Sequence, residues 1–130
     1  MVTSMTGRSQ RAFTLIELLV VLTIMATLLS IVAPRYMESV DKAKEAALKT
    51  NLRLVREAID KYKGDRQRYP DSLQQLVDER YLAALPIDPV TDRNDTWQVV
   101  FPPAPAASAV YDIRSGAPGT GRNGSAYGEW

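Results

Sequence analysis

The stretch Ala12-Phe13-Thr14-Leu15-Ile16-Glu17, with the apolar run 18–33 that follows it, decides how this chain is organised. Positions 13–33 are mostly Leu, Val, Ile, Ala and Met, and as an α-helix they rise about 31 Å, enough to cross the hydrocarbon core of a bilayer. One carboxylate, Glu17, lies in this run without a cationic side chain in its own segment. Because an ionisable group inside a membrane helix costs on the order of a few kcal/mol, Glu17 is a candidate functional residue.

The residues before this run are polar and basic. Positions 1–12 contain Arg8 and Arg11 and no acidic residue, a bias typical of the cytoplasmic side of a membrane helix. A cleaved secretory signal is the alternative, but its apolar region is usually only about 7–15 residues long. Here the run is longer, and the small residue at its end, Ala33, is followed by Pro34. We therefore expect a retained transmembrane helix over 13–33, with the N-terminus in the cytoplasm and the rest of the chain across the membrane.

Pro34 is expected to kink or end the membrane helix, because proline removes one helix hydrogen bond and clashes with the preceding turn. The hydroxyls of Thr23, Thr27 and Ser30 are compatible with lipid, since they can bond back to helix carbonyls. After Pro34 the spacing predicts an amphipathic helix over 34–66, with charge pairs such as Arg56 with Asp60 on its solvated faces. Its apolar residues, at steps of three and four, are Tyr36, Val40, Ala43, Ala47, Leu48, Leu52, Val55, Ile59 and Tyr62.

Residues 67–130 are predicted to form a small domain. Asp71 or Ser72 can cap a short helix with Leu73, Leu76 and Val77 facing inward. Alternation at 97, 99 and 101 predicts a half-buried strand over 97–101, and a second strand is expected over 110–114. The glycine-rich segment 115–128 is expected to be a loop that can return as an edge strand ending at Trp130. The fold class is therefore α+β, with a long N-terminal helix packed on a small antiparallel sheet.

Composition limits the chemistry available to this chain. It has no cysteine and no histidine, which excludes disulfides, a thiol nucleophile, zinc–thiolate sites and the usual general base. A net charge of +1 without a basic stripe argues against binding nucleic acid, and the glycines after 115 do not open a helix as a nucleotide-binding motif would. Only Asp88 near Asp92 could suggest catalysis. We therefore predict that the protein is not an enzyme and has no catalytic residues.

The residues 12–18 resemble the processing motif of type IV pilins and of the pseudopilins of type II secretion systems: a short basic leader, a small residue, Phe-Thr-Leu-Ile-Glu and an apolar helix. In those families a prepilin peptidase cuts after the small residue and methylates the new N-terminal phenylalanine. The resemblance implies removal of the leader 1–12 by a cut between Ala12 and Phe13, N-methylation of Phe13, a role in filament assembly for Glu17 and a helix kink at Pro34. Ala12 departs from the family, which usually has glycine there.

A cut after Ala12 would also explain the carboxylate. Phe13 would then carry a free amine about one helical turn from Glu17. In a row of parallel, staggered helices, each carboxylate could meet the ammonium group of a neighbour, and such a buried ion pair can set register even when its net contribution to stability is small.

Later motifs extend the resemblance toward the major, G-type pseudopilins: Tyr69-Pro70, Asp88-Pro89, the strands near Trp97 and Tyr111, and the close 115–130. The resemblance implies a subunit that polymerises with copies of itself into a periplasmic pseudopilus for protein secretion. The implied partners are the prepilin peptidase, minor pseudopilins, the inner-membrane assembly platform and the membrane itself. Two alternatives stay open: a type IV pilin for adhesion, motility or DNA uptake, and a membrane-anchored binding module.

Major pseudopilins are known for a calcium ion in the last loop, so the resemblance also implies one. Calcium takes about six to eight oxygen ligands. Between 115 and 130 the only acidic side chain is Glu129, and Ala117 and Asn123 stand where the family tends toward acid. We therefore predict no cofactor and no metal ligand, with a calcium site as the less favoured alternative.

Overall fold

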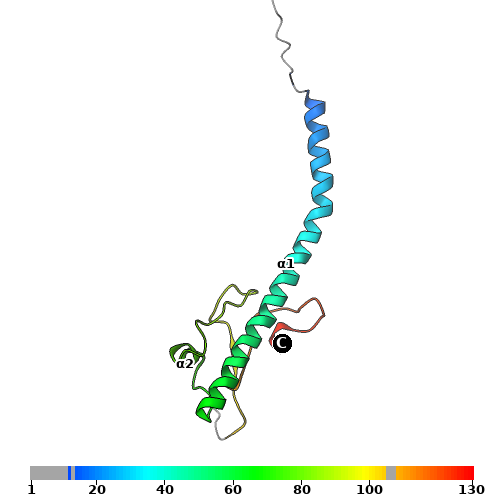
Figure 1. The fold of residues 1–130 in the computed structure, drawn as a ribbon. Coiled ribbons are helices and arrows are strands. Elements are labelled where there is room, and N and C mark those ends of the chain that lie inside the picture. The colour runs from blue at the N-terminus through cyan, green and yellow to red at the C-terminus, as the bar shows by residue number, and fades with distance from the viewer. Residues whose placement is uncertain (1–11, 13, 105–107) are drawn as a thin grey trace, which may run out of the picture. The chain divides into compact units, whose positions relative to one another are not determined.

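A computed structural model describes residues 12, 14–104 and 108–130 (Figure 1). Along the chain these residues form the 52-residue helix α1 (Leu15–Arg66), the short helix α2 (Leu73–Asp78), the strands β1 (Gln98–Val100) and β2 (Asp112–Arg114), and a 3₁₀ turn, η1 (Tyr127–Glu129). The chain divides into two compact units, one ending at Glu38 and one comprising Ser39–Trp130. A long helix and a small antiparallel sheet confirm the predicted α+β class.

The first unit consists of the N-terminal part of α1. Its large apolar side chains are exposed, from 81% for Leu15 to 48% for Val21. The hydroxyls of Thr23, Thr27 and Ser30 bond to the carbonyls of Leu19, Thr23 and Thr27 at 2.7–2.8 Å, as predicted, so no hydroxyl of the three needs water as a partner. Among the described residues, α1 is the one helix long and apolar enough to cross a membrane.

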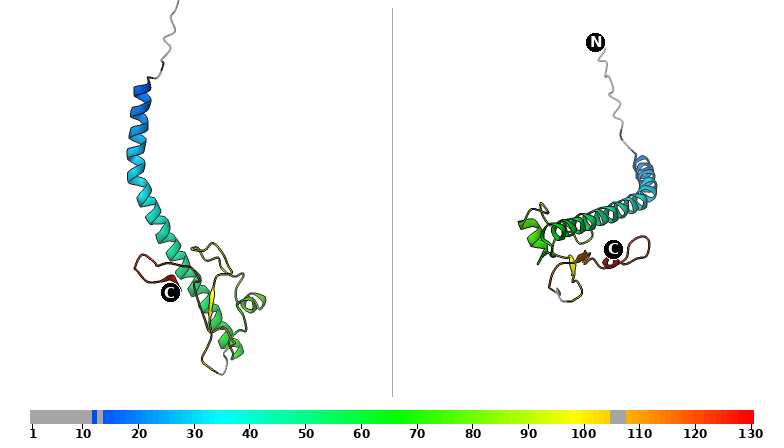
Figure 2. Two further views of the ribbon diagram at one scale, coloured as in Figure 1. Left: turned by 180° about the vertical axis from the view of Figure 1, so that it is seen from behind. Right: turned by 60° about the horizontal axis from the view of Figure 1, so that its bottom comes forward.

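The second unit is built around the C-terminal part of α1, which lies beside α2 and the strands in both views of Figure 2. The apolar stripe of α1 is buried from Leu48 onward, as the steps of three and four predict. Earlier positions are not: Ala43 and Ala47 are exposed and Tyr36 is 68% exposed, so the predicted stripe was too long. The core contains Leu48, Leu52, Val55, Ala58, Ile59, Tyr62, Leu76, Leu82, Trp97, Val110 and Ile113.

The sheet has two antiparallel strands, with Val99 of β1 opposite Ile113 of β2. Trp97 is buried and Val99 half-buried, but Phe101 is 58% exposed, so the predicted alternation fails at its last position. β1 ends at Val100, and the buried ring of Pro102, which has no N–H to donate, follows just after the ladder. β2 begins at Asp112, two residues later than predicted, because the Val110 N–H is used by the carbonyl of Pro70.

Two further elements were predicted with different success. Ser72 caps α2 by accepting a hydrogen bond from the Gln75 N–H at 3.1 Å, and Leu76 faces the core, as expected. The predicted C-terminal edge strand is wrong. The segment instead makes a single antiparallel bridge, Thr120 with Ala126, on either side of the turn that contains Gly124, whose φ is +83°, and it then ends in η1.

Candidate functional site

Glu17 lies in the first turn of α1, and the sequence explains why the helix begins there. The Glu17 N–H donates to Oγ1 of Thr14 at 3.2 Å, and the Thr14 carbonyl accepts from the Leu18 N–H at 3.2 Å. Thr14 thus caps the helix, in the Thr-x-x-Glu spacing of a capping box. A carboxylate in the first turn also interacts favourably with the helix dipole. The local fold therefore favours a glutamate at position 17 because this position lies in the first turn of the helix.

No described residue neutralises the Glu17 carboxylate. Its segment is exposed, and none of the ion pairs among residues 12, 14–104 and 108–130 involves it. The predicted partner, Phe13, and the leader arginines lie outside the described residues, and Ala12 is described only as exposed. The cut between Ala12 and Phe13 and the methylation of Phe13 therefore stay predictions, as does the role of Glu17.

Pro34 lies inside α1, which continues through it without a break. The alternative that this proline ends the helix is therefore wrong for this chain, while the kink stays a prediction. Proline without an N–H leaves one helix carbonyl without its usual donor, so the helix is held less tightly at this turn than elsewhere.

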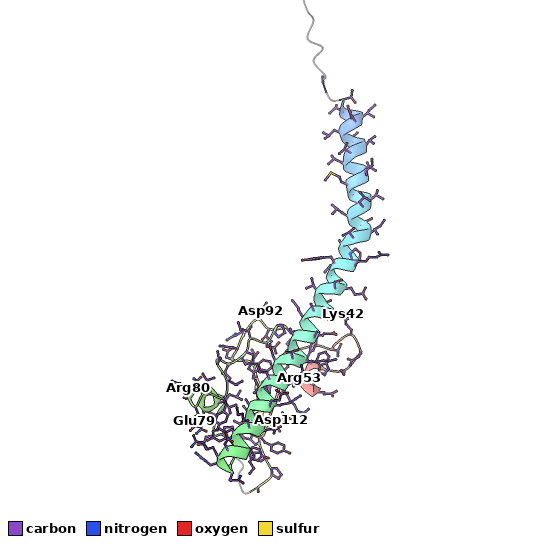
Figure 3. The ribbon with its side chains drawn as sticks, viewed as in Figure 1. Lys42, Arg53, Glu79, Arg80, Asp92 and Asp112 are labelled. Carbon is purple, nitrogen blue, oxygen red and sulfur yellow. The ribbon has the colours of Figure 1, made fainter. Side chains whose placement is uncertain are left out.

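The loop 115–130 packs against one face of α1 in the second unit. Arg56 donates from Nε to Oδ1 of Asp112 at 2.8 Å, and from Nη2 to the main-chain oxygens of Ile113 and Trp130 at 2.9 and 2.6 Å. Figure 3 shows Asp112 close to the part of α1 that carries Arg53. The predicted pair of Arg56 with Asp60 is replaced by these contacts, because a half-buried guanidinium can satisfy several acceptors at once across the domain.

The loop 115–130 is also where the family resemblance implies a calcium ion, and its side-chain oxygens bond to one another. The Asn123 side-chain oxygen accepts from both the N–H and the hydroxyl of Ser125, at 3.0 and 2.6 Å. The Ser125 hydroxyl in turn accepts from the Trp130 indole at 2.6 Å. Among the described residues, no three acidic side chains come together, so a calcium ion here would depend on hydroxyl, amide and main-chain oxygens, and the oxygens of Asn123 and Ser125 are already used within the loop. The residues present do not fit a calcium ion.

The two aspartates that could have suggested catalysis have different surroundings. Asp88 is fully buried, and its carboxylate accepts from the Ser115 hydroxyl at 2.5 Å and the Val90 N–H at 2.8 Å. Asp92, labelled in Figure 3, is exposed, with φ of +56°. Asp88 is therefore occupied in joining the turn 88–93 to the start of the loop, which is a structural task.

A group of ionisable side chains lies at the C-terminal end of α1. Tyr62 is buried, and burial, with Glu79 next to it, raises the pKa of its hydroxyl. Tyr81 stacks edge-on against Tyr62 with ring centroids 5.2 Å apart and donates to Asp65 at 2.9 Å, which raises the pKa of Tyr81. Arg66 pairs with Glu79 at 3.4 Å. These contacts join the C-terminal end of α1 to the segment 79–81 that follows α2.

Sequence reasoning missed two of these features. The Thr14 cap was readable, since Thr-x-x-Glu before an apolar run is a helix-start signal. The role of Arg56 had no such signal, because its partners are 56 to 74 positions away in the sequence.

Comparisons with known proteins agree with the sequence motifs. The family described as the prokaryotic N-terminal methylation motif matches residues 7–33, and the family described as type II secretion system (T2SS), protein G, matches residues 35–129. Relatives named type II secretion system core protein G are 32% identical in Klebsiella michiganensis (89% of this chain, 92% of the relative) and 29% identical in Pseudomonas aeruginosa (97% and 99%). The Escherichia coli protein of that name is 32% identical over 84% of this chain and 82% of its own.

No solved structure gives a significant match. The two family matches together span almost the entire chain, and they separate at the same place as the apolar and amphipathic parts of the sequence. The chain therefore belongs to the type II secretion system protein G family, and its role is that of a structural pseudopilin in type II secretion.

Proposed function

We propose that this chain is made as a precursor, cut between Ala12 and Phe13, methylated at Phe13, and polymerised through α1 into a periplasmic pseudopilus that drives secretion. The observation that carries the proposal is Glu17, a carboxylate in an exposed apolar helix without a cationic partner among the described residues. Within a single chain, the position in the first turn of the helix offers Glu17 only the interaction with the helix dipole. A row of identical chains offers it a cationic partner, because each supplies both a carboxylate and an amine.

The proposed assembly step is the pairing of Glu17 with the amine of Phe13 in a neighbouring copy. Glu17 lies in the first turn of α1, and Phe13 precedes it by four positions in the sequence, so the two groups of neighbouring copies would meet when the helices are parallel and displaced along the axis by about one turn. Removing a charge from water in a lipid environment is costly, and the pair reduces that cost for both partners. The pair therefore selects one register among the many that apolar packing alone would allow.

The apolar side chains of α1 would supply most of the contact between subunits. From Leu15 to Val32, every large apolar side chain on α1 is about half or more exposed, so the surface is available to lipid before assembly and to other helices after it. Van der Waals packing drives the association of such helices, because lipid tails are as apolar as the side chains. Glu17 would then fix register, while these residues hold the helices together.

The proposed topology follows from the charge of the leader. Arg8 and Arg11 would keep the N-terminus in the cytoplasm, where the prepilin peptidase acts at the membrane surface, and the domain 39–130 would fold in the periplasm. The inner-membrane assembly platform would add subunits at the base of the filament, and minor pseudopilins would join the same polymer through helices of the same kind.

Mass spectrometry of the protein purified from a host with a prepilin peptidase tests the processing. The expected N-terminus is Phe13 carrying one added methyl group. The same protein from a host without the peptidase is the control and should keep residues 1–12. An uncut leader in the presence of the peptidase, or an N-terminus at Pro34, contradicts the proposal.

Substitution of Glu17 tests the assembly step. Glu17→Gln keeps the shape and removes the charge, whereas Glu17→Asp keeps the charge on a shorter side chain and is the matched control. Each variant is co-expressed with the wild-type protein, and its share of purified filaments is measured. We expect Glu17→Gln to be depleted relative to Glu17→Asp at equal membrane abundance. Equal incorporation of Glu17→Gln and the wild-type protein would remove the ion pair from the mechanism.

A further inference from the structure

Three charged side chains of α1 contact the loop 115–130 from one face of the helix. Glu45, Lys49 and Arg56 are spaced by four and seven residues, which places them in one row along the helix surface. Leu52, buried in the core, occupies the position between Lys49 and Arg56 in the same row. The row lies within the second unit, so these contacts belong to the folded domain.

The three side chains bind two parts of the loop, Arg122 in its middle and Trp130 at its end. A carboxylate oxygen of Glu45 accepts from the Arg122 N–H at 2.6 Å. The ammonium of Lys49 lies 4.7 Å from the centre of the Trp130 ring, in cation–π geometry. Arg56 donates to the main-chain oxygen of Trp130 at 2.6 Å. The middle and the end of the loop are thus both attached to the helix.

The loop itself leaves little for a cation to bind. The turn 121–125 is closed by hydrogen bonds from the Gly121 N–H to the Ser125 carbonyl and from the Gly124 N–H to the Gly121 carbonyl, at 2.8 and 3.0 Å. The Gly121 backbone packs against the Trp130 indole so closely that a Cβ there would collide with the ring. The nearby carboxylates are already used, because Glu45 accepts from the Arg122 N–H and Asp112 is paired with Arg56, and the Lys49 ammonium adds a positive charge beside Trp130.

We propose that Glu45, Lys49 and Arg56 form a latch that takes the place of the family's calcium ion, so that the last loop of this pseudopilin closes without a metal. In such a latch the Glu45 carboxylate supplies the negative charge that binds the Arg122 N–H, and the two cations hold Trp130 over the turn. The fold of the domain is then independent of the calcium concentration in the periplasm.

The first test measures calcium dependence on the full mature chain in detergent micelles. The unfolding temperature, Tm, is followed by the fluorescence of Trp97 and Trp130, in EDTA and in about 10 mM calcium, which exceeds the dissociation constants of typical extracellular calcium modules. The same amount of magnesium is the control for ionic strength. We expect the same Tm in all three solutions. A Tm that rises with calcium and not with magnesium would overturn the proposal.

The second test opens the latch. Glu45→Ala removes the acceptor of the Arg122 N–H, and Glu57→Ala, an exposed glutamate on the same helix, is the matched control. Trypsin cleavage after Arg122 is followed by mass spectrometry, with helix content by circular dichroism as a check on folding. Losing a hydrogen bond to a charged group should raise the cleavage rate about tenfold in Glu45→Ala. Cleavage at the rate of Glu57→Ala would show that Glu45 does not hold the loop.

Discussion

Replacing Leu52 by alanine should unfold the domain far more readily than the same change at Leu54, two residues further along α1. Leu52 is 1% exposed and lies in the centre of the core, whereas Leu54 is 49% exposed. Leu→Ala removes three carbon atoms, which at about 0.8 kcal/mol for each buried CH₂ is about 2.4 kcal/mol of lost transfer free energy. The cavity left behind adds to this, so the free energy of unfolding should fall by about 3 kcal/mol for Leu52→Ala.

The Tm of the full chain in micelles measures this difference. For a domain of this size each kcal/mol shifts Tm by about 4–8 °C, so Leu52→Ala should lower it by about 12–24 °C. Leu54→Ala should cost less than about 1 kcal/mol, because an exposed side chain loses little contact. Both tryptophans lie in the second unit, so their fluorescence follows this unit without interference from the membrane helix. Equal shifts for the two variants would refute the assignment of the core to this face of α1.

Three further predictions concern single contacts of the domain. Tyr62→Phe removes a hydroxyl that is buried without a hydrogen-bond partner among the described residues, so at pH 7 Tm should stay the same or rise. Burial raises the pKa of Tyr62 above the 10.0 of an unperturbed tyrosine, and Glu79 faces the hydroxyl, with Arg66 and Arg68 nearby. The unfolded chain therefore loses this proton first, and the stability present below pH 10.0 is lost as pH rises through the raised pKa. In urea unfolding, Tyr62→Phe should lose less stability over this pH range than the wild-type protein. Asp88→Asn should cost about 1–3 kcal/mol in urea unfolding, because the Ser115 and Val90 donors lose a charged acceptor, and an unchanged midpoint would deny the buried link. Ser72→Ala should cost about 1 kcal/mol by loss of the α2 cap, with Gln74→Ala, on the exposed side of α2, as the comparison.

The helix was predictable because its signals are local and repeated. From Leu48 to Tyr62 the apolar residues recur at helical steps over several turns, and each turn independently indicates the same buried face. At Ala43 and Ala47 the same spacing gave a wrong result, because a small apolar residue fits either a core or a solvent face and the pattern cannot tell how far the partner layer extends.

The end of the chain was less predictable because its structure depends on distant contacts. Phe101 continues the alternation of β1 but lies after the strand has ended, and nothing local to 97–101 marks that end except Pro102. Arg56 has a helical neighbour of opposite charge in Asp60, yet contacts Asp112 and Trp130, whose proximity only the folded domain creates. The motif 12–17 differs from both, because its residues are adjacent in the sequence and indicate a function without reference to the fold.

The burial of α1 has a consequence for how such proteins can change. Every buried side chain of this helix lies between Leu48 and Tyr62, and the first unit ends at Glu38. Sequence changes in the first unit, before Ser39, therefore do not affect the packing of the domain core, and are limited only by the membrane and by neighbouring copies. A secretion system could alter the packing of its filament, or exchange the entire anchor for that of another pilin-like protein, while the exported domain keeps its stability unchanged.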